Sequence, residues 1–298
     1  MKNIVVNAER DYTVSIGGQW DSSLSELIQS RTRVGVIVSA GFSPDLASIQ
    51  ALDCDVHVFT VPDGEEAKSA STLLTLWNWL GAAGFTRSDL IVGIGGGAIT
   101  DLAGFTAASW LRGIDWIAVP TSLAGMVDAS VGGKTGINSD YGKNLIGAFH
   151  SPIAVIVDIE FLKTLSPRDL SAGMAEVIKC GFISDSEILK LSAACSTQTL
   201  LTKPEVLQDL IFRAISVKAA VVSTDFRESY AREALNYGHT LGHAIEIYSK
   251  YQLRHGEAVA IGMVFVAELA LARGLIDAST VALHRDLLAR FELPTTFD

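Results

Sequence analysis

The sequence predicts an α/β N-terminal domain followed by an all-helical C-terminal domain. In the first half, short apolar runs alternate with glycine turns and helical stretches, a pattern typical of a mostly parallel sheet covered on both faces. After Asp158, long segments with apolar residues at helical spacing replace these runs. A length of 298 residues also favours two domains over one. We therefore expect an α/β domain over residues 1–160 and a helical domain over residues 161–298.

Five apolar runs of strand length are predicted to form the sheet: Val34–Val38, Val56–Val61, Leu90–Ile94, Trp116–Val119 and Ala154–Val157. Helical stretches are predicted between them, from Pro44, over Ala70–Ala83, and after the glycines at 95–97 through Ser109. The second half is predicted to form helices over Leu170–Phe182, Ser186–Ala194, Val206–Thr224, Arg232–Ser249, Glu257–Ala272 and Thr280–Arg290. The most apolar stretch, Ala258–Ala267, is too short to span a bilayer, so we expect a buried helix there.

Composition indicates which ligands the protein can bind and which compartment it occupies. A net charge of −10 argues against nucleic acid as a partner, and it requires a local cluster of lysines and arginines for any anionic ligand. The three cysteines, Cys54, Cys180 and Cys195, are an odd set without close spacing. They are typical of the reduced cysteines of a cytosolic protein.

The run Gly93–Ala98 follows a predicted strand and opens a predicted helix. Glycines there let the backbone approach a pyrophosphate, and the helix N-terminus favours its negative charge. The flanking strand and helix are consistent with a Rossmann-like dinucleotide site and equally with the alternative, a tight turn with no ligand. Asp101, expected in the first helical turn, either serves the helix start or binds a ligand hydroxyl.

A second glycine-rich stretch covers residues 128–149 and presents Lys134 after Gly132-Gly133 and Lys143 after Gly142. Lysines on glycine loops suit the capture of phosphate or carboxylate, because backbone amides and a point charge converge. The alternative is a pair of surface turns with solvated lysines. Because two such loops follow a candidate nucleotide site closely in the sequence, we favour anion binding over surface turns.

A third group has the side chains of a metal site. His239 and His243 are four residues apart on a predicted helix and share its face, His255 begins the next helix, and Glu176 lies upstream. Imidazoles with a carboxylate suit zinc, and a catalytic zinc keeps one position open. A lone histidine is more often structural, but three within seventeen positions strain that interpretation. Thr240 stands where a zinc protease has its glutamate, which disfavours that class.

Long segments of the chain resemble 3-dehydroquinate synthases. These segments are GGGAITDLAGFTAASWLRG, VPTSLAGMVDASVGGKTGIN, GKNLIGAF, AGMAEVIKCG, NYGHTLGHAIE and HGEAVAIGM, in that family's order from Pro62 to Met263. The resemblance implies the dehydroquinate synthase-like fold and a cytoplasmic, often dimeric enzyme of the shikimate pathway. Its substrate would be 3-deoxy-D-arabino-heptulosonate 7-phosphate, a phosphorylated sugar acid.

The resemblance also implies the reaction and the cofactors. The family oxidises a ring hydroxyl with bound NAD, eliminates phosphate, returns the hydride, opens the ring and closes a carbocycle by aldol addition. NAD is regenerated in each turnover, and Zn2+, Co2+ or another divalent ion assists.

Site residues carry over onto the matching positions of this sequence. The resemblance implies that Glu176, His239 and His255 bind the metal, and that His243, Lys134, Asn236 and Arg232 are catalytic. It implies substrate contacts from Arg112, Asp128, Lys134, Lys143, Asn144, Lys179, Lys218, Arg232 and Asn236. It implies NAD contacts from Asp63, Gly64, Glu65, Lys68, Gly96, Gly97, Asp101, Thr121, Ser122, Asp128, Lys134, Lys143 and Thr164.

Three features depart from the family pattern. Ser122 stands where a second threonine is common, and residues 38–41 lack the acidic residue that often meets the adenosine ribose. The chain ends at Asp298, several dozen residues earlier than the family usually does, so we expect a missing tail that would carry another substrate lysine.

Three other functions compete with this interpretation. One is a sister sugar-phosphate cyclase, and another is a metal-dependent alcohol or glycerol dehydrogenase. The third is an inactive protein that binds NAD and a metal, which the early end of the chain suggests. Dehydroquinate formation is favoured over the sister cyclases by the retention of Lys134, Lys143, Asn144, Lys179, Arg232 and Asn236.

Overall fold

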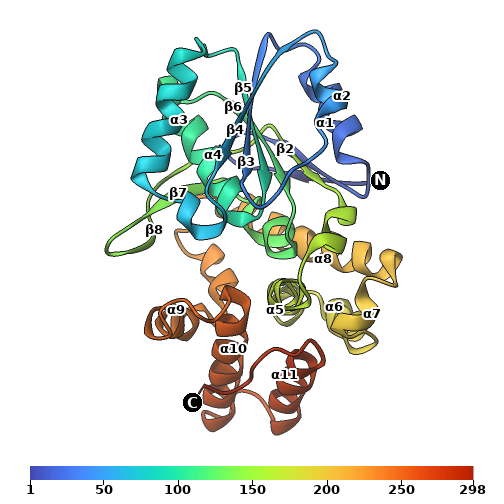
Figure 1. Ribbon diagram of the computed structural model, residues 1–298. Coiled ribbons are helices and arrows are strands. Elements are labelled where there is room, and N and C mark those ends of the chain that lie inside the picture. The colour runs from blue at the N-terminus through green and yellow to red at the C-terminus, as the bar shows by residue number, and fades with distance from the viewer. Residues whose placement is uncertain (298) are drawn as a thin grey trace. The chain divides into compact units, whose positions relative to one another are not determined.

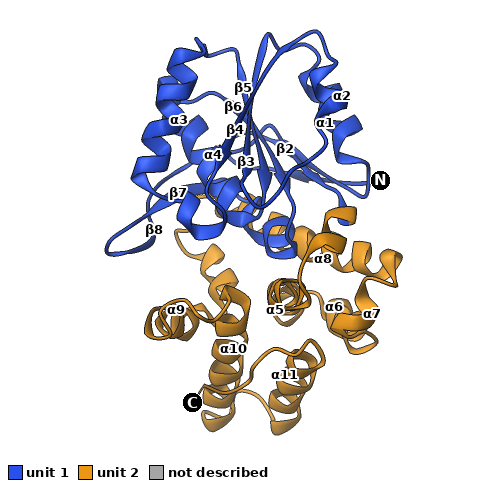
Figure 2. Cartoon of the chain, in the orientation of Figure 1, with its two compact units in different colours: residues 1–159 blue, residues 160–298 orange. Residues whose placement is uncertain are grey.

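The chain forms two compact units, Met1–Ile159 and Glu160–Asp298 (Figure 2). The structure, a computed structural model, describes residues 1–297. Each unit has its own apolar core and is described by itself.

A seven-stranded sheet is the centre of unit 1 (Figure 1). Its first two strands pair antiparallel at one edge, and every other pair is parallel, which confirms the predicted mostly parallel sheet. The strands in spatial order are β1 (Lys2–Val6), β2 (Tyr12–Ile16), β9 (Ala154–Val157), β6 (Asp115–Pro120), β5 (Leu90–Gly95), β3 (Arg33–Ser39) and β4 (Asp55–Val61). The inner strands β5, β6 and β9 are almost wholly buried, so they have continuous apolar sequences.

Helices flank this sheet on both sides, with α1 and α2 opposite α3 (Figure 1). The helical elements of unit 1 are α1 (Trp20–Ile28), α2 (Ala47–Gln50), η1 (Gly64–Ala67), α3 (Ala70–Ala82), α4 (Gly97–Ser109), η2 (Trp110–Arg112) and η3 (Gly125–Ala129). Helix α4 packs on β5 and β6. It approaches β5 closely because a Cβ at Gly93 would lie 2.6 Å from the Ala103 Cβ, so only glycine fits there.

The prediction of two lysine-bearing loops over residues 128–149 is wrong in its secondary structure. This segment forms a separate antiparallel pair, β7 (Lys134–Ser139) and β8 (Gly142–Phe149), and both lysines lie on strands. The two backbones approach so closely that a Cβ at Gly147 would overlap the Thr135 carbonyl oxygen. Glycines that indicated turns therefore serve here as small residues inside a tight pair of strands.

Unit 2 is helical within its described residues. Its elements are η4 (Ile159–Thr164), α5 (Pro167–Ile183), α6 (Ser186–Ala193), α7 (Thr197–Leu200), α8 (Pro204–Thr224), η5 (Ala231–Asn236), α9 (His239–Tyr248), α10 (His255–Ala272) and α11 (Ala278–Arg290). Helix α10 lies between α9 and α11 and also packs on α5 (Figure 1). By length and composition α10 is apolar enough to cross a membrane, but more than half of it is buried within the fold. That burial agrees with the predicted core helix.

The predicted single helix over Arg232–Ser249 is wrong, because the chain breaks at Gly238. Gly238 has a φ of +80°, a left-handed conformation that glycine adopts without strain. Its backbone lies directly against α10, where a Cβ at Gly262 would overlap the Gly238 carbonyl oxygen. The break makes His239 the first residue of α9.

Replacing Gly262 by alanine tests this close approach. The added methyl meets backbone, which cannot move aside, so we expect Gly262→Ala to lower the free energy of unfolding by about 1–3 kcal/mol. The control is Gly81→Ala in α3, where the new Cβ would lie 3.5 Å from the Trp110 ring. A glycine inside a helix costs about 0.5–1 kcal/mol relative to alanine, so the control should keep or gain stability. Equal urea midpoints for the two variants would contradict the tight contact.

Candidate metal centre and cofactor site

Three helices of unit 2 bring Glu176, His239 and His255 together. Glu176 lies in the middle of α5, and the two histidines are the first residues of α9 and α10. One ligand atom from each lies within 4.8 Å of the others. The Glu176 Oε1 atom faces both imidazoles, at 3.8 Å from His239 Nε2 and 3.5 Å from His255 Nε2. The structure therefore places the three residues at one point, as their residue types suggested.

Glu176 is the buried centre of this group. It is 1% exposed, and neither carboxylate oxygen accepts a well-formed hydrogen bond from the described residues. Its Oε2 atom lies 2.5 Å from Lys179 Nζ, one helical turn along α5. Burial opposes ionisation, but the Lys179 charge and the two imidazoles outweigh it and hold the pKa of Glu176 well below its usual range. The carboxylate thus stays charged and keeps Oε1 directed at the imidazoles.

Hydrogen bonds fix which nitrogen each imidazole presents. His239 Nδ1 lies 3.2 Å from the Tyr237 carbonyl oxygen, and His255 Nδ1 lies 3.1 Å from Glu246 Oε2. Both partners only accept, so each Nδ1 carries the hydrogen and each Nε2 faces Glu176. Two imidazole nitrogens and one carboxylate oxygen form the donor set of a zinc site with an open position. The residues present therefore fit a divalent transition metal.

Electrostatics at His255 favour a cation. Burial lowers the affinity of this ring for a proton, but Glu176 and Glu246 outweigh it and raise the pKa of His255 to about 10. Two carboxylates, one on each side of the ring, stabilise positive charge there, whether a proton or a metal ion supplies it.

His243 lies beside this group. Its ring centroid is 5.4 Å from that of His239 and 5.9 Å from that of His255, and the residue is exposed. With Glu246 and His255 it forms a second group of possible ligand atoms within 4.8 Å. The three histidines that spacing left as equal candidates thus fall into two overlapping groups, His239 and His255 with Glu176, and His243 and His255 with Glu246.

Ion pairs lock α5 to the start of α10. Arg168 donates to Glu257 through Nε at 2.6 Å and through Nη2 at 2.7 Å. Arg254 Nε lies 2.9 Å from Asp169 Oδ1, and the Arg254 backbone N–H donates to Glu257 Oε2 at 2.7 Å. These ion pairs were not predicted from the sequence, where charged residues near two helix starts were the signal that could have indicated them.

Unit 2 also buries three cationic side chains. Lys179, Lys218 and Arg232 are 2%, 7% and 2% exposed, which is unusual for lysine and arginine. They come from α5, α8 and η5, which pack on one another. Arg232 donates to the Phe226 carbonyl oxygen at 2.6 Å. Asn236 is exposed and donates to Glu228 Oε1 at 3.0 Å.

Asp225 holds the segment that carries Arg232 and Asn236. Its carboxylate accepts hydrogen bonds from the backbone N–H groups of Ser229, Tyr230 and Arg232, at 2.9, 2.8 and 3.2 Å. The hydrogen bonds from the Ser229 and Tyr230 backbones contribute most to lowering the pKa of Asp225, which lies far below its ordinary value. Asp225 therefore orders the turn that leads into η5.

In unit 1 the glycine turn lies between β5 and α4, as expected. Gly96 precedes α4 and has no side-chain cap, so the first N–H groups of the helix remain available to an anion. The Thr121 backbone N–H donates to the Gly95 carbonyl oxygen at 2.8 Å, and Ser122 Oγ accepts from the Gly125 N–H at 3.1 Å. Gly97 lies close to η3, because a Cβ at Gly97 would be 3.0 Å from the Ala129 Cβ.

Lys68 connects this turn to the β7–β8 pair. Its Nζ lies 2.5 Å from Asp101 Oδ2 and donates to Asn144 Oδ1, and the residue is 3% exposed. Asp101 is not in the first turn of α4, contrary to our expectation, because the helix already begins at Gly97. The carboxylate pairs with Lys68 and does not serve the helix start.

Asn138 is a residue that the sequence did not reveal. Its Nδ2 donates to Glu65 Oε2 at 2.7 Å, and its Oδ1 accepts from the Asn144 N–H at 3.0 Å. Its own N–H donates to the Lys68 carbonyl oxygen at 2.8 Å. Asn138 thus ties η1 to both strands, and only the strand pairing makes this visible.

The remaining predicted residues lie outside these two networks. Asp63, next to Gly64, is exposed just after β4. Its side chain lies beside Gly41, which follows β3, because a Cβ at Gly41 would lie 2.7 Å from Asp63 Oδ2. Arg112 is exposed with a φ of +68°. Lys134 is exposed at the start of β7, and Asp128 and Lys143 are half-buried. Thr164 belongs to unit 2, where its Oγ1 donates to the Phe161 carbonyl oxygen at 2.7 Å.

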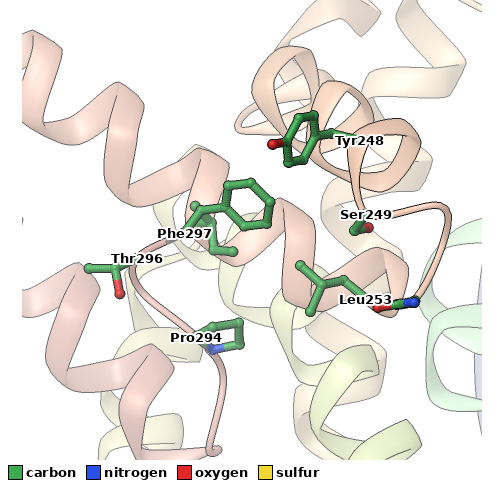
Figure 3. Close-up of a pocket in the computed structure, with 8 residues that line it drawn as sticks. Tyr248, Ser249, Leu253, Pro294, Thr296 and Phe297 are labelled. Carbon is green, nitrogen blue, oxygen red and sulfur yellow. The ribbon is translucent and has the colours of Figure 1, made fainter.

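A pocket of about 370 Å³ lies elsewhere in unit 2, at the C-terminal end of α9 (Figure 3). Its labelled lining residues are Tyr248, Ser249, Leu253, Pro294, Thr296 and Phe297. The predicted site residues are not part of its lining, and the metal-site histidine of α9 is at the other end of that helix.

Comparison with known proteins identifies the family. The family model of the 3-dehydroquinate synthase N-terminal region matches residues 58–172, and that of the C-terminal region matches residues 173–298. The chain belongs to the 3-dehydroquinate synthase family. The 3-dehydroquinate synthase of Thermobifida fusca (strain YX) is 51% identical over 96% of this chain and 79% of its own length.

Solved structures of related cyclases share the fold of this 3-dehydroquinate synthase family member. A 2-deoxy-scyllo-inosose synthase, complexed with carbaglucose-6-phosphate, NAD+ and Co2+, is 29% identical with a TM-score of 0.86, over 97% of this chain and 82% of that one. The 2-epi-5-epi-valiolone synthase of Streptomyces hygroscopicus subsp. jinggangensis 5008, with NAD+ and Zn2+ bound, is 25% identical with a TM-score of 0.87, over 99% and 84%. These likenesses confirm the predicted fold class.

The Asp225 turn gives a test by pH. A carboxylate whose folded pKa is lowered contributes stability above its unfolded pKa of about 3.9 and loses it as the pH falls toward the folded value. We expect Asp225→Asn to unfold at a lower urea concentration than the wild type at pH 7, with the difference shrinking below about pH 4. Asp277→Asn, which removes a similar cap from α11, is the control.

The two variants should differ in the segment they loosen. Amide hydrogen exchange should speed up over residues 226–236 in Asp225→Asn and not in Asp277→Asn. Unchanged exchange over that segment would contradict the role of Asp225.

Proposed function

We propose that this protein converts 3-deoxy-D-arabino-heptulosonate 7-phosphate to 3-dehydroquinate and phosphate, as a carbon–oxygen lyase that consumes no net NAD. The observation that carries the proposal is the convergence of Glu176, His239 and His255 around one point, in a chain 51% identical to a 3-dehydroquinate synthase. The three residues are those that the family resemblance implied as metal ligands.

Glu176 Oε1, His239 Nε2 and His255 Nε2 would hold Zn2+ or Co2+. A divalent ion at this position would polarise a substrate hydroxyl and ease the loss of its proton. Lys179 balances the second oxygen of Glu176, so the carboxylate can present Oε1 without taking up a proton itself.

The NAD site of the proposal is the end of β5 and the start of α4. NAD bound there would supply reversible hydride transfer. Gly96 and Gly97 allow a pyrophosphate to approach the helix N-terminus, and Lys68 and Asp101 form a buried pair beside it. Asp63, beside Gly41, supplies an exposed carboxylate near the end of β3, where the sequence lacks the family's usual acid. The full proposed set is Asp63, Gly64, Glu65, Lys68, Gly96, Gly97, Asp101, Thr121, Ser122, Asp128, Lys134, Lys143 and Thr164.

Cationic side chains would hold the phosphate and carboxylate of the substrate. The buried Lys179, Lys218 and Arg232 are largely shielded from water, which strengthens their attraction for an anion. The proposed substrate set is Arg112, Asp128, Lys134, Lys143, Asn144, Lys179, Lys218, Arg232 and Asn236. These side chains would hold one substrate in place through successive steps, so positioning would supply much of the rate enhancement.

His243 is the proposed proton carrier, with Lys134, Asn236 and Arg232 as the other catalytic residues. It shares a face of α9 with His239 but is exposed, and imidazole is the side chain best suited to take and give a proton at neutral pH. We also propose a cytoplasmic homodimer. None of the three cysteines, all within the described residues, forms a disulfide, which agrees with a reducing compartment.

An assay of products separates this proposal from its rivals. With Zn2+, catalytic NAD and the heptulosonate phosphate, we expect phosphate and 3-dehydroquinate in equal amounts and no accumulation of NADH. Phosphate release from a hexose phosphate instead would favour a sister cyclase. Net NADH from a simple polyol would favour a dehydrogenase, and cofactor binding without any product would indicate an inactive protein.

Replacing His243 by alanine tests the division of roles among the histidines. We expect His243→Ala to keep about one equivalent of zinc by metal analysis and to lose about 10²–10⁴-fold in turnover, the usual contribution of general acid–base catalysis. His239→Ala is the comparison, and it should lose the metal. Loss of zinc from His243→Ala would show that the ligand assignment is wrong.

A further inference from the structure

Glu246 is a buried carboxylate with no role in the proposed reaction. It lies on α9, seven residues after His239 and three after His243, so helical geometry directs it toward the same face. It is 3% exposed. Burying a carboxylate is costly unless a partner offsets the lost hydration, so such a residue calls for a specific contact.

That contact is with His255. Glu246 Oε2 accepts a hydrogen bond from His255 Nδ1 at 3.1 Å, from one helix to the next. On the other side of the same ring, Nε2 lies 3.5 Å from Glu176 Oε1. The imidazole is therefore held between two carboxylates, one at each nitrogen.

We propose that Glu246 is a positioning residue for the metal site. By accepting the Nδ1 hydrogen it keeps His255 in the tautomer that leaves Nε2 free, and it aims Nε2 at the point that Glu176 and His239 face. Histidines that bind metals commonly donate their second N–H to a carboxylate in this way, and the carboxylate raises the basicity of the ligand. The inference rests on the proposed metal site.

The two histidine ligands differ in this respect. His239 donates its Nδ1 hydrogen to the Tyr237 carbonyl oxygen at 3.2 Å, and the short turn at Gly238 fixes that oxygen. His255 has 37% of its side chain exposed, against 11% for His239. The more exposed ring, with less packing to orient it, is the one whose Nδ1 has a charged partner.

A different interpretation uses the same residues. Glu246, His243 and His255 could themselves bind the ion, because their ligand atoms also lie within 4.8 Å. That arrangement would turn His255 Nδ1 toward the metal, break its hydrogen bond to Glu246 and leave Glu176 Oε1, which faces both Nε2 atoms, without a ligand role. The positioning role gives both carboxylates a partner at His255, so the structure favours it.

Metal affinity of variants at Glu246 tests the proposal. We expect Glu246→Ala to weaken Zn2+ binding by about 10- to 100-fold in competition with a chelator. Glu246→Gln keeps an oxygen that accepts the hydrogen bond but loses the charge, so it should bind Zn2+ with intermediate affinity. The visible absorption spectrum of the Co2+-loaded protein should change in Glu246→Ala, because the ligand geometry relaxes.

Two controls separate this role from general loss of stability. Glu268→Gln makes the same chemical change on α10, where the side chain pairs with Arg285 at 2.8 Å, and it should leave Zn2+ affinity unchanged. Urea unfolding of each metal-free variant shows whether the fold is retained. If Glu246→Ala does not fold, the Zn2+ affinity of the isosteric Glu246→Gln decides the outcome.

Each outcome has a defined meaning. Zn2+ affinity of folded Glu246→Gln and Glu246→Ala within twofold of the wild type would overturn the inference and leave the metal site standing. Loss of the metal from His243→Ala and Glu246→Ala, but not from Glu176→Ala, would place the ion in the other group and overturn both. Failure of the wild type to bind Zn2+ or Co2+ would overturn the proposed metal site itself.

Discussion

The structure of unit 2 depends on one buried charge, the carboxylate of Glu176. A carboxylate at 1% exposure destabilises a fold unless partners offset its lost hydration. Here those partners are Lys179 on the same helix and imidazoles from α9 and α10. The start of α9 at His239, the start of α10 at His255 and the burial of Lys179 all serve this group. Because removing one partner leaves the others as uncompensated buried charges, the helices cannot shift independently without a large electrostatic cost.

Close helix packing makes this convergence possible. A side chain at Gly256 would overlap the Ala172 carbonyl oxygen of α5, and one at Gly262 would overlap the Gly238 carbonyl oxygen. Glycines on α10 thus let two other segments of backbone approach, and they lie one and seven residues from His255. The Arg168–Glu257 pair then fixes α5 against the same end of α10. The short reach of an imidazole and a glutamate explains why the backbones must come so near.

Much of this could be predicted from sequence, and the failures have physical causes. Strands such as Leu90–Ile94 and helices such as Ala70–Ala83 have strong periodicity, and helical spacing with residue chemistry brought out Glu176 and the histidines. Periodicity could not show the break at Gly238, since apolar residues continue across it and only contact with α10 demands it. The β7–β8 pair was hidden because its glycines indicate turns. The roles of Glu246 and Asn138 could not be predicted, because they depend on partners from other elements.

The local balance of charge explains how a protein of net charge −10 can bind a substrate that carries both a phosphate and a carboxylate. Long-range repulsion is screened within about 10 Å at ordinary ionic strength, so the charges next to the ligand decide its affinity. Glu176 neutralises one positive charge, whereas the proposed divalent ion and Lys179 together bring three, and Glu246 offsets only one more. The group therefore remains positive, and the buried Lys218 and Arg232 of the same unit add to it. Because these cations are largely removed from water, each attracts an anion more strongly than a surface lysine would.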